Sequence, residues 1–230
     1  MLCFGHRGAK GHAPENTIRS IIKGLELGVD WIEIDVFYID GHLVVFHDET
    51  LERTTNGRGF LRDKTFSFLR SLDAGEGERI PTLQEVLDAI AGRAGLNIEI
   101  KGDNAASAVV NLIQDRARSG WGIDSFLVSS FNQREIARVR QLDQRVRIGV
   151  LLDGFPNCYP AIVDTVSAYS VHQNIEHIDE LFIADAHALG LKVFAYTANH
   201  PQEIRRMSTL GVDGVFSDYP ERVLSIRNSL

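Results

Sequence analysis

The sequence predicts an α/β protein, a (β/α)8 TIM barrel with a small insertion after an early hairpin. Short apolar runs alternate with segments whose apolar residues recur every three or four positions, which is typical of strand–helix units in a parallel sheet. We count eight such units, and 230 residues suit one barrel of roughly 250 residues better than two compact domains. The same alternation fits an open doubly wound sheet, which stays an alternative.

Each predicted strand is a short apolar run bounded by turn residues. In chain order, the eight strands are expected at Leu2–Gly5, Trp31–Val36, Leu96–Lys101, Phe126–Ser130, Arg147–Leu152, Ala168–His172, Lys192–Thr197 and Gly214–Ser217.

Helices are predicted between the strands from apolar stripes and from residues that mark helix ends. The two clearest stripes comprise Ile18, Ile21, Ile22 and Leu25, and Ala105, Ala108, Val109, Leu112 and Ile113. Thr82 and Glu85 form a capping box at a helix start, and Gly190 suits the position just after a helix. Pro201 and Pro220 suit first helical positions.

The second strand does not lead straight into a helix. Asp40-Gly41 stands between two extended runs and therefore predicts a tight hairpin. Counting back from that turn along both strands places Asp35 opposite Phe46. The following residue, His47, would then return to the level of the Glu33 and Asp35 side chains.

Residues 49–80 form the predicted insertion. They contain the turn sequence Thr55-Asn56-Gly57 but no helical stripe long enough for a second domain. We expect them to form a small subdomain over the barrel mouth, within a single domain of residues 1–230.

The composition narrows the classes of partner. A formal net charge of −7 argues against broad contact with nucleic acid or anionic lipid, so an anionic substrate would need a local cation. The two cysteines, Cys3 and Cys158, are too few for a disulfide scaffold or a zinc site and favour a reducing compartment. No leader-like segment and no membrane-spanning apolar run is evident, so a cytoplasmic location without stable membrane insertion is the default expectation.

Carboxylates on two neighbouring strands suggest a metal site. Glu33 and Asp35 are two residues apart, so their side chains share one face of a strand, and Glu99 with Lys101 repeats this spacing on the next barrel strand. If that face lines the barrel, the like charges repel and are desolvated unless a cation compensates. Three oxygen ligands suit Mg2+ or Ca2+ better than zinc. A solvent-facing strand of alternating polarity is the simpler alternative.

Two histidines are candidates for acid/base catalysis. His6 ends the first strand between Gly5 and Gly8, at the rim where catalytic groups of barrels sit, although a packed structural histidine is also possible there. The hairpin would bring His47 to the same rim. Two imidazoles can serve as general acid and general base on a phosphorus centre near neutral pH, with Arg7 and Lys101 holding the phosphate charge.

Seven motifs in this order give the chain a resemblance to a known family. They are GHRG at Gly5–Gly8, PENT at Pro14–Thr17, EIDV at Glu33–Val36, DGHLVVFHD at Asp40–Asp48, IPTLQEVL at Ile80–Leu87, EIK at Glu99–Lys101 and GVDGVFSD at Gly211–Asp218. Over nearly its whole length the chain resembles the glycerophosphodiester phosphodiesterases of the phospholipase-C-like barrel superfamily.

The resemblance implies a role for each candidate residue. His6 and His47 would be the acid/base pair, Glu33, Asp35 and Glu99 the metal ligands, and Arg7 and Lys101 the phosphate-binding residues, with Glu15 of PENT beside or just behind them. It also implies that the glycerol 2-hydroxyl attacks phosphorus and expels the alcohol. Water would then open the cyclic phosphate to give glycerol phosphate.

Two departures from the family pattern concern the substrate pocket. Tyr196 stands where the family usually has Trp, so the wall against the glycerol or alcohol group is expected to differ, and the insertion is short for the family. The alternatives are a lysophospholipase D-like activity, a metal hydrolase of another kind, which usually carries His-x-His on an early strand, and a non-catalytic barrel that binds phosphorylated ligands. The sequence does not predict the oligomeric state.

Overall fold

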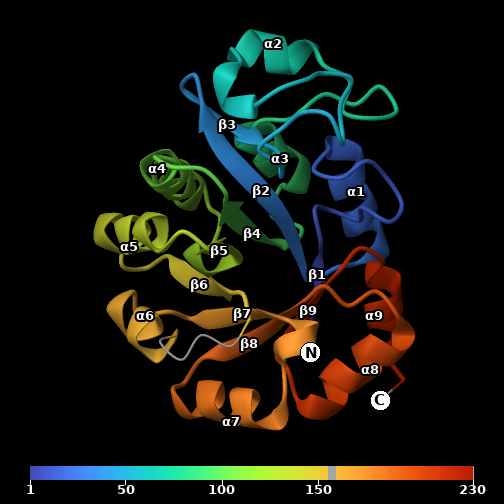
Figure 1. Ribbon diagram of the computed structural model, residues 1–230, viewed down its shortest axis with the longest axis vertical. Coiled ribbons are helices and arrows are strands. Elements are labelled where there is room, and N and C mark those ends of the chain that lie inside the picture. The colour runs from blue at the N-terminus through green and yellow to red at the C-terminus, as the bar shows by residue number, and fades with distance from the viewer. Residues whose placement is uncertain (155–158, 230) are drawn as a thin grey trace.

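The computed structural model describes residues 1–154 and 159–229, in which eight parallel strands close into a barrel (Figure 1). Strand β1 pairs with both β2 and β9, which closes the sheet and excludes the open alternative. The barrel strands are β1 Leu2–Gly5, β2 Trp31–Ile39, β4 Gly95–Ile100, β5 Phe126–Ser130, β6 Arg147–Leu152, β7 Ser170–Asn174, β8 Lys192–Tyr196 and β9 Gly214–Ser217. The predicted (β/α)8 fold is confirmed.

Helices surround this barrel (Figure 1). They are α1 Ile18–Leu27, α3 Leu83–Ile90, α4 Ala106–Arg118, α5 Gln133–Leu142, α6 Tyr159–Thr165, α7 Glu180–Ala188, α8 Pro201–Leu210 and α9 Pro220–Arg227, with short 3-10 turns η2 Ile123–Ser125 and η3 Ile175–His177. The capping box at Thr82, the glycine after α7 and the two starting prolines are confirmed.

Two details of the predicted elements are wrong. Strand β7 is shifted two residues along the chain from the expected range, because Gln173 and Asn174 still pair with β8. Gln173 is fully buried although it is polar, and its amide donates to the carbonyl of Gly154. Ile22 is 38% exposed, since the buried face of α1 is centred on Ser20, Ile21 and Gly24. Small residues lie on that face because the loop after β1 packs against it.

The apolar residues form separate layers. The largest cluster, which includes Cys3, lies between the sheet and the helices, whereas Cys158 falls outside the described residues. Inside the barrel, the Phe4 ring packs at a tilt against Phe194 and Phe216 with ring centroids 4.8 and 4.6 Å apart. Aromatic rings thus fill part of the barrel interior as a packed core.

The β2–β3 hairpin and the insertion extend from this barrel, at the top of Figure 1. Strand β3, His42–Val45, is antiparallel to β2, and the amide of Phe46 donates to the carbonyl of Asp35, as the Asp-Gly turn predicted. The insertion contains η1 Leu61–Asp63 and α2 Phe66–Ser71, and its buried Leu51, Leu61 and Leu69 belong to an apolar cluster of their own. Treating residues 1–230 as one domain stays a prediction.

None of the described helices is long and apolar enough to cross a bilayer. The cytoplasmic location expected from the sequence stays a prediction.

Candidate active site

A cavity of about 140 Å³ lies at the carboxyl ends of the barrel strands. Seven of the predicted site residues line it: His6, Arg7, Glu33, His47, Glu99, Lys101 and Tyr196. The other two lie directly behind, since Arg7 contacts both Glu15 and Asp35. The structure therefore brings residues from three strands, β2, β4 and β8, and from the loops after β1, β3 and β4 to one end of the barrel, where barrel enzymes place their catalytic groups.

The GHRG loop owes its shape to contacts with helix α1. Arg7 and Gly8 have positive φ angles of 51° and 85°. A Cβ atom on Gly8 would lie only 2.4 Å from Oγ of Ser20, so a side chain at this position would push the loop off the helix. Ser20 donates to the carbonyl of Arg7 and accepts from the amide of Ala9, which fixes His6 and Arg7 at the rim.

The three predicted metal ligands converge. Asp35 and Glu99 are direct neighbours in the β2–β4 register, and one carboxylate oxygen from each of Glu33, Asp35 and Glu99 lies within 4.8 Å of the others. Glu33 and Asp35 are only 2% and 1% exposed. Burial, together with the charge of Asp35, raises the pKa of Glu33 well above its usual value and that of Glu99 to about 7. Such a cluster of hard oxygen donors fits a divalent cation that would offset this repulsion.

Two cationic side chains flank the carboxylates. Nζ of Lys101 lies 2.8 Å from Oε1 of Glu99 and 3.9 Å from Oδ1 of Asp35. Arg7 approaches from the other side, with Nε 3.3 Å from Oδ2 of Asp35 and its backbone amide donating to Glu33. Both cations border the cavity and can therefore balance the charge of an anionic ligand there.

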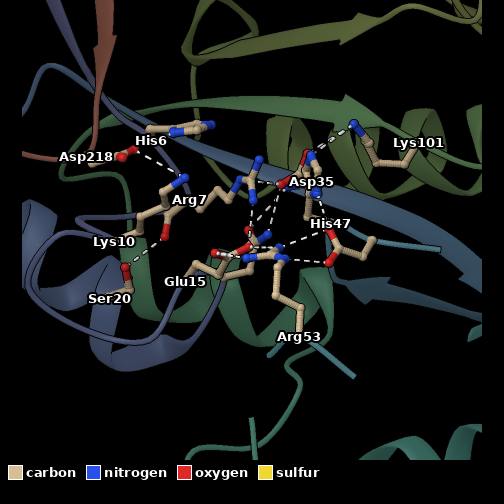
Figure 2. A network of polar contacts seen from close by, with 12 residues as sticks. His6, Arg7, Lys10, Glu15, Ser20, Asp35, His47, Arg53, Lys101 and Asp218 are labelled. Carbon is tan, nitrogen blue, oxygen red and sulfur yellow. Dashed lines mark hydrogen bonds and ion pairs between the residues drawn. The ribbon is translucent and has the colours of Figure 1, made fainter. Parts of the chain in front are cut away.

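Each predicted catalytic histidine is held by a carboxylate, as Figure 2 shows for His6 and Asp218. Nδ1 of His6 lies 2.6 Å from Oδ1 of Asp218, and Nδ1 of His47 lies 2.5 Å from Oδ1 of Asp48. An ionised carboxylate can only accept, so Nδ1 of each ring carries a proton and Nε2 is left for chemistry. Burial lowers the pKa of both imidazoles below the usual value.

Tyr196, which was predicted to form a wall of the substrate pocket, contributes its aromatic ring to the cavity and not its hydroxyl group. Tyr196 lines the cavity with its side chain, but its hydroxyl donates to the carbonyl of Leu152, 2.5 Å away, and burial raises its pKa. Phe131 meets the Tyr196 ring edge to face, with centroids 6.3 Å apart, and is 46% exposed. These two rings offer an apolar wall beside Lys101.

Several residues that hold the site were not predicted. Asp48 and Asp218 are each the last residue of a motif already recognised, and Asn16 of the PENT motif donates to Oδ2 of Asp35 at 2.9 Å. Arg53 bonds both Asp48 and Glu15. Asp48 directly follows His47, which is a usable sequence signal, whereas the partner of His6 lies 212 residues away and becomes visible only when β1 pairs with β9.

Comparisons with known proteins agree with this geometry. Residues 6–222 match the Glycerophosphoryl diester phosphodiesterase family. A glycerophosphodiester phosphodiesterase of Caldanaerobacter subterraneus subsp. tengcongensis is 36% identical, with 98% of this chain and 97% of the relative covered, and one of Bacillus altitudinis is 32% identical, with 99% and 98% covered.

Among solved structures, a phosphodiesterase of Oleispira antarctica in complex with the product sn-glycerol-3-phosphate superposes with a TM-score of 0.90. It is 31% identical, and the match covers 99% of this chain and 97% of that one. The family match, the relatives and the fold all lead to the same assignment. The chain belongs to the glycerophosphoryl diester phosphodiesterase family and is a phosphoric diester hydrolase.

Proposed function

We propose that this enzyme hydrolyses glycerophosphodiesters to glycerol 3-phosphate and an alcohol, with His6 and His47 as the acid/base pair. The observation that carries the proposal is that two carboxylate-held imidazoles, two cations and the carboxylates of Glu33 and Glu99 border one cavity of about 140 Å³, with Asp35 directly behind them. A glycerol phosphate group is of the size and charge that such a cavity would take.

Arg7 and Lys101 bind the phosphate in this proposal. Each side chain carries a fixed positive charge against the cavity and is already oriented by carboxylates, Arg7 by Glu15 and Lys101 by Glu99. Because both cations are largely buried, their attraction for a phosphate is less screened than it would be at the surface. They hold the diester with its phosphorus between the two imidazoles.

The two histidines move the protons. In the first step the glycerol 2-hydroxyl forms a bond to phosphorus while its proton passes to Nε2 of one imidazole. The bond to the leaving alcohol breaks, and that oxygen receives a proton from Nε2 of the other imidazole, which enters the step protonated on both ring nitrogens. Water then opens the cyclic phosphate with the roles of the rings reversed, which restores both protonation states.

Glu33, Asp35 and Glu99 would hold a divalent cation, Mg2+ or Ca2+. The donor set fits, because three carboxylates with mutual oxygen distances within 4.8 Å offer hard oxygen ligands, and the pKa of Glu33 stays well above its usual value even with Arg7 beside it, so a further positive charge would be favourable there. When bound, such an ion supplies polarisation of the phosphoryl oxygens and stabilisation of the charge that develops on them. The choice between the two ions stays a prediction.

The test is one assay of glycerophosphocholine, glycerophosphoethanolamine and a lysophospholipid, each with and without EDTA, with released glycerol phosphate as the readout. We expect turnover of the first two that is lost with EDTA, and a transient cyclic phosphate signal by 31P NMR. Full activity in excess EDTA would remove the metal from the proposal. Lysophospholipid turnover without turnover of either water-soluble diester would replace it by a lysophospholipase D-like activity.

A further inference from the structure

Arg53 lies in the insertion, outside the cavity, yet four of its hydrogen bonds reach toward the site. It sits in a turn that is anchored by buried Leu51, whose amide donates to Gly59 and whose carbonyl accepts from Thr55. The backbone position of Arg53 is thus fixed by the packing of the insertion. The Arg53 side chain is 48% exposed, so burial alone does not explain its orientation.

The Arg53 guanidinium donates hydrogen bonds to two carboxylates at once (Figure 2). Nε and Nη2 donate to Asp48 at 2.5 and 2.9 Å, and Nη1 and Nη2 donate to Glu15, each at 2.7 Å. The bonds from Arg53 are the first cause of a pKa of about 2 at Asp48, and together with Arg7 they outweigh burial to give about 2 at Glu15. Two paired arrangements on one planar group are specific to arginine.

Each of these two carboxylates is also hydrogen-bonded to a residue that lines the cavity. Oδ1 of Asp48 bonds Arg53 and also Nδ1 of His47 at 2.5 Å. Oε1 of Glu15 bonds Arg53 and also Nη1 of Arg7 at 2.6 Å. A single guanidinium therefore joins the support of an imidazole to the support of a phosphate-binding cation.

The geometry points to Arg53 as a positioning residue that orients His47 through Asp48 and Arg7 through Glu15. This inference rests on the roles given above to His47 and Arg7. Without Arg53, Asp48 is free to rotate away from the imidazole, and Nδ1 of His47 loses the acceptor that keeps its proton there. Glu15 keeps Arg7 but loses its own anchor, so the phosphate-binding guanidinium gains freedom.

The contacts through Asp48 and through Glu15 are expected to affect different kinetic constants. Asp48→Asn is expected to lower kcat with little change in KM, and Glu15→Gln to raise KM with little change in kcat. Arg53→Ala is expected to do both, each by roughly 10- to 100-fold, since small misplacements of catalytic groups cost about this much. Arg53→Lys is expected to resemble Arg53→Ala, because an ammonium cannot make two paired contacts.

The matched control is Arg58→Ala, which removes an exposed guanidinium from the same insertion and is expected to leave both constants unchanged. Added guanidinium chloride, well below its denaturing range, is expected to restore much of the kcat of Arg53→Ala but not that of Asp48→Asn. Arg53→Ala with both constants within twofold of wild type would overturn the inference. So would a loss that guanidinium does not relieve in a correctly folded variant.

A spectroscopic readout separates this inference from the proposed function. In 15N-labelled protein, the imidazole nitrogens of His47 are expected to show the proton on Nδ1 in wild type and a shift toward the Nε2-protonated form in Arg53→Ala. If His47→Ala kept full turnover, the proposed function would be wrong, but the nitrogen shifts would still report whether Arg53 orients the ring. If the 15N shifts of His47 are unchanged in Arg53→Ala, the inference is wrong even if the enzyme is active.

Discussion

Replacing Asp218 by Asn should reverse the protonation of the His6 imidazole. In the wild type, Oδ1 of Asp218 faces Nδ1 of His6 at 2.6 Å, and Oδ2 accepts from Nδ2 of Asn199 at 2.9 Å. The Asn199 amide cannot simply flip, because its Oδ1 accepts from the Asp218 amide at 2.8 Å and from the Ser217 hydroxyl at 3.2 Å. Asn199 therefore favours an orientation in which the new amide points its oxygen at Asn199 and its NH2 group at His6, even though Nζ of Lys10 lies 3.5 Å from the position that this NH2 group would take.

The magnitude follows from that favoured orientation. An NH2 group facing Nδ1 of His6 drives the ring proton to Nε2, which blocks the nitrogen that is needed for proton transfer. Recovering the active tautomer would forgo a hydrogen bond to a charged acceptor, worth about 1.5–3 kcal/mol, and would leave two donors opposed, at roughly 1–3 kcal/mol. The sum corresponds to a fall in kcat of roughly 10²- to 10⁴-fold, with KM nearly unchanged.

The assay is release of glycerol phosphate from glycerophosphocholine at saturating substrate. Asp213→Asn is the matched control, because Asp213 also pairs with a histidine, His187 at 2.8 Å, but precedes β9 where Asp218 follows it. It changes the same chemistry at the other end of the same strand. A kcat for Asp218→Asn within fivefold of wild type, or an equal loss in the control, would refute the reasoning.

Three further outcomes are expected. His47→Ala should lower kcat by about 10²-fold or more, and unchanged turnover with intact circular dichroism would remove its catalytic role. Glu99→Gln should weaken Mg2+ or Ca2+ binding by at least about tenfold in calorimetric titration, and wild-type affinity would contradict its place as a ligand. Burial lowers the pKa of His172 to about 3, so the unfolded chain binds more protons than the fold below about pH 6.5. The free energy of unfolding should therefore decrease as the pH is lowered from about 6.5 to 3, by up to about 1.4 kcal/mol per pH unit. His172→Asn should remove this contribution to the pH dependence in denaturant titrations.

Local periodicity explains why much of the site could be predicted. Glu33, Asp35 and Glu99 share a face because side chains alternate along each strand, and neighbouring parallel strands keep that face in register. The Asp-Gly turn likewise fixes the hairpin register, and with it the level to which His47 returns. These relations depend only on a few consecutive residues and on one pair of strands, so they can be predicted from the sequence.

Residues that support the site escaped prediction where their partners depend on the assembled barrel. The buried face of α1 differs from its apolar stripe because the GHRG loop packs against Ser20 and Gly24, a contact that no helical period reveals. His172 was expected at a strand end, but β7 continues past it, and its ring is fully buried against Phe194 and Phe216.

The contrast between the two histidines shows how distance along the chain limits such inference. His47 takes its carboxylate from the next residue, so one dipeptide contains both the ring and its support. His6 takes its carboxylate from Asp218, which reaches it only because the last strand pairs with the first and sets Gly5 beside Ser217. Equivalent chemistry at the two rings therefore depends on one local contact and on one that requires barrel closure. It follows that a substitution that loosens the β1–β9 pairing should impair His6 before it impairs His47.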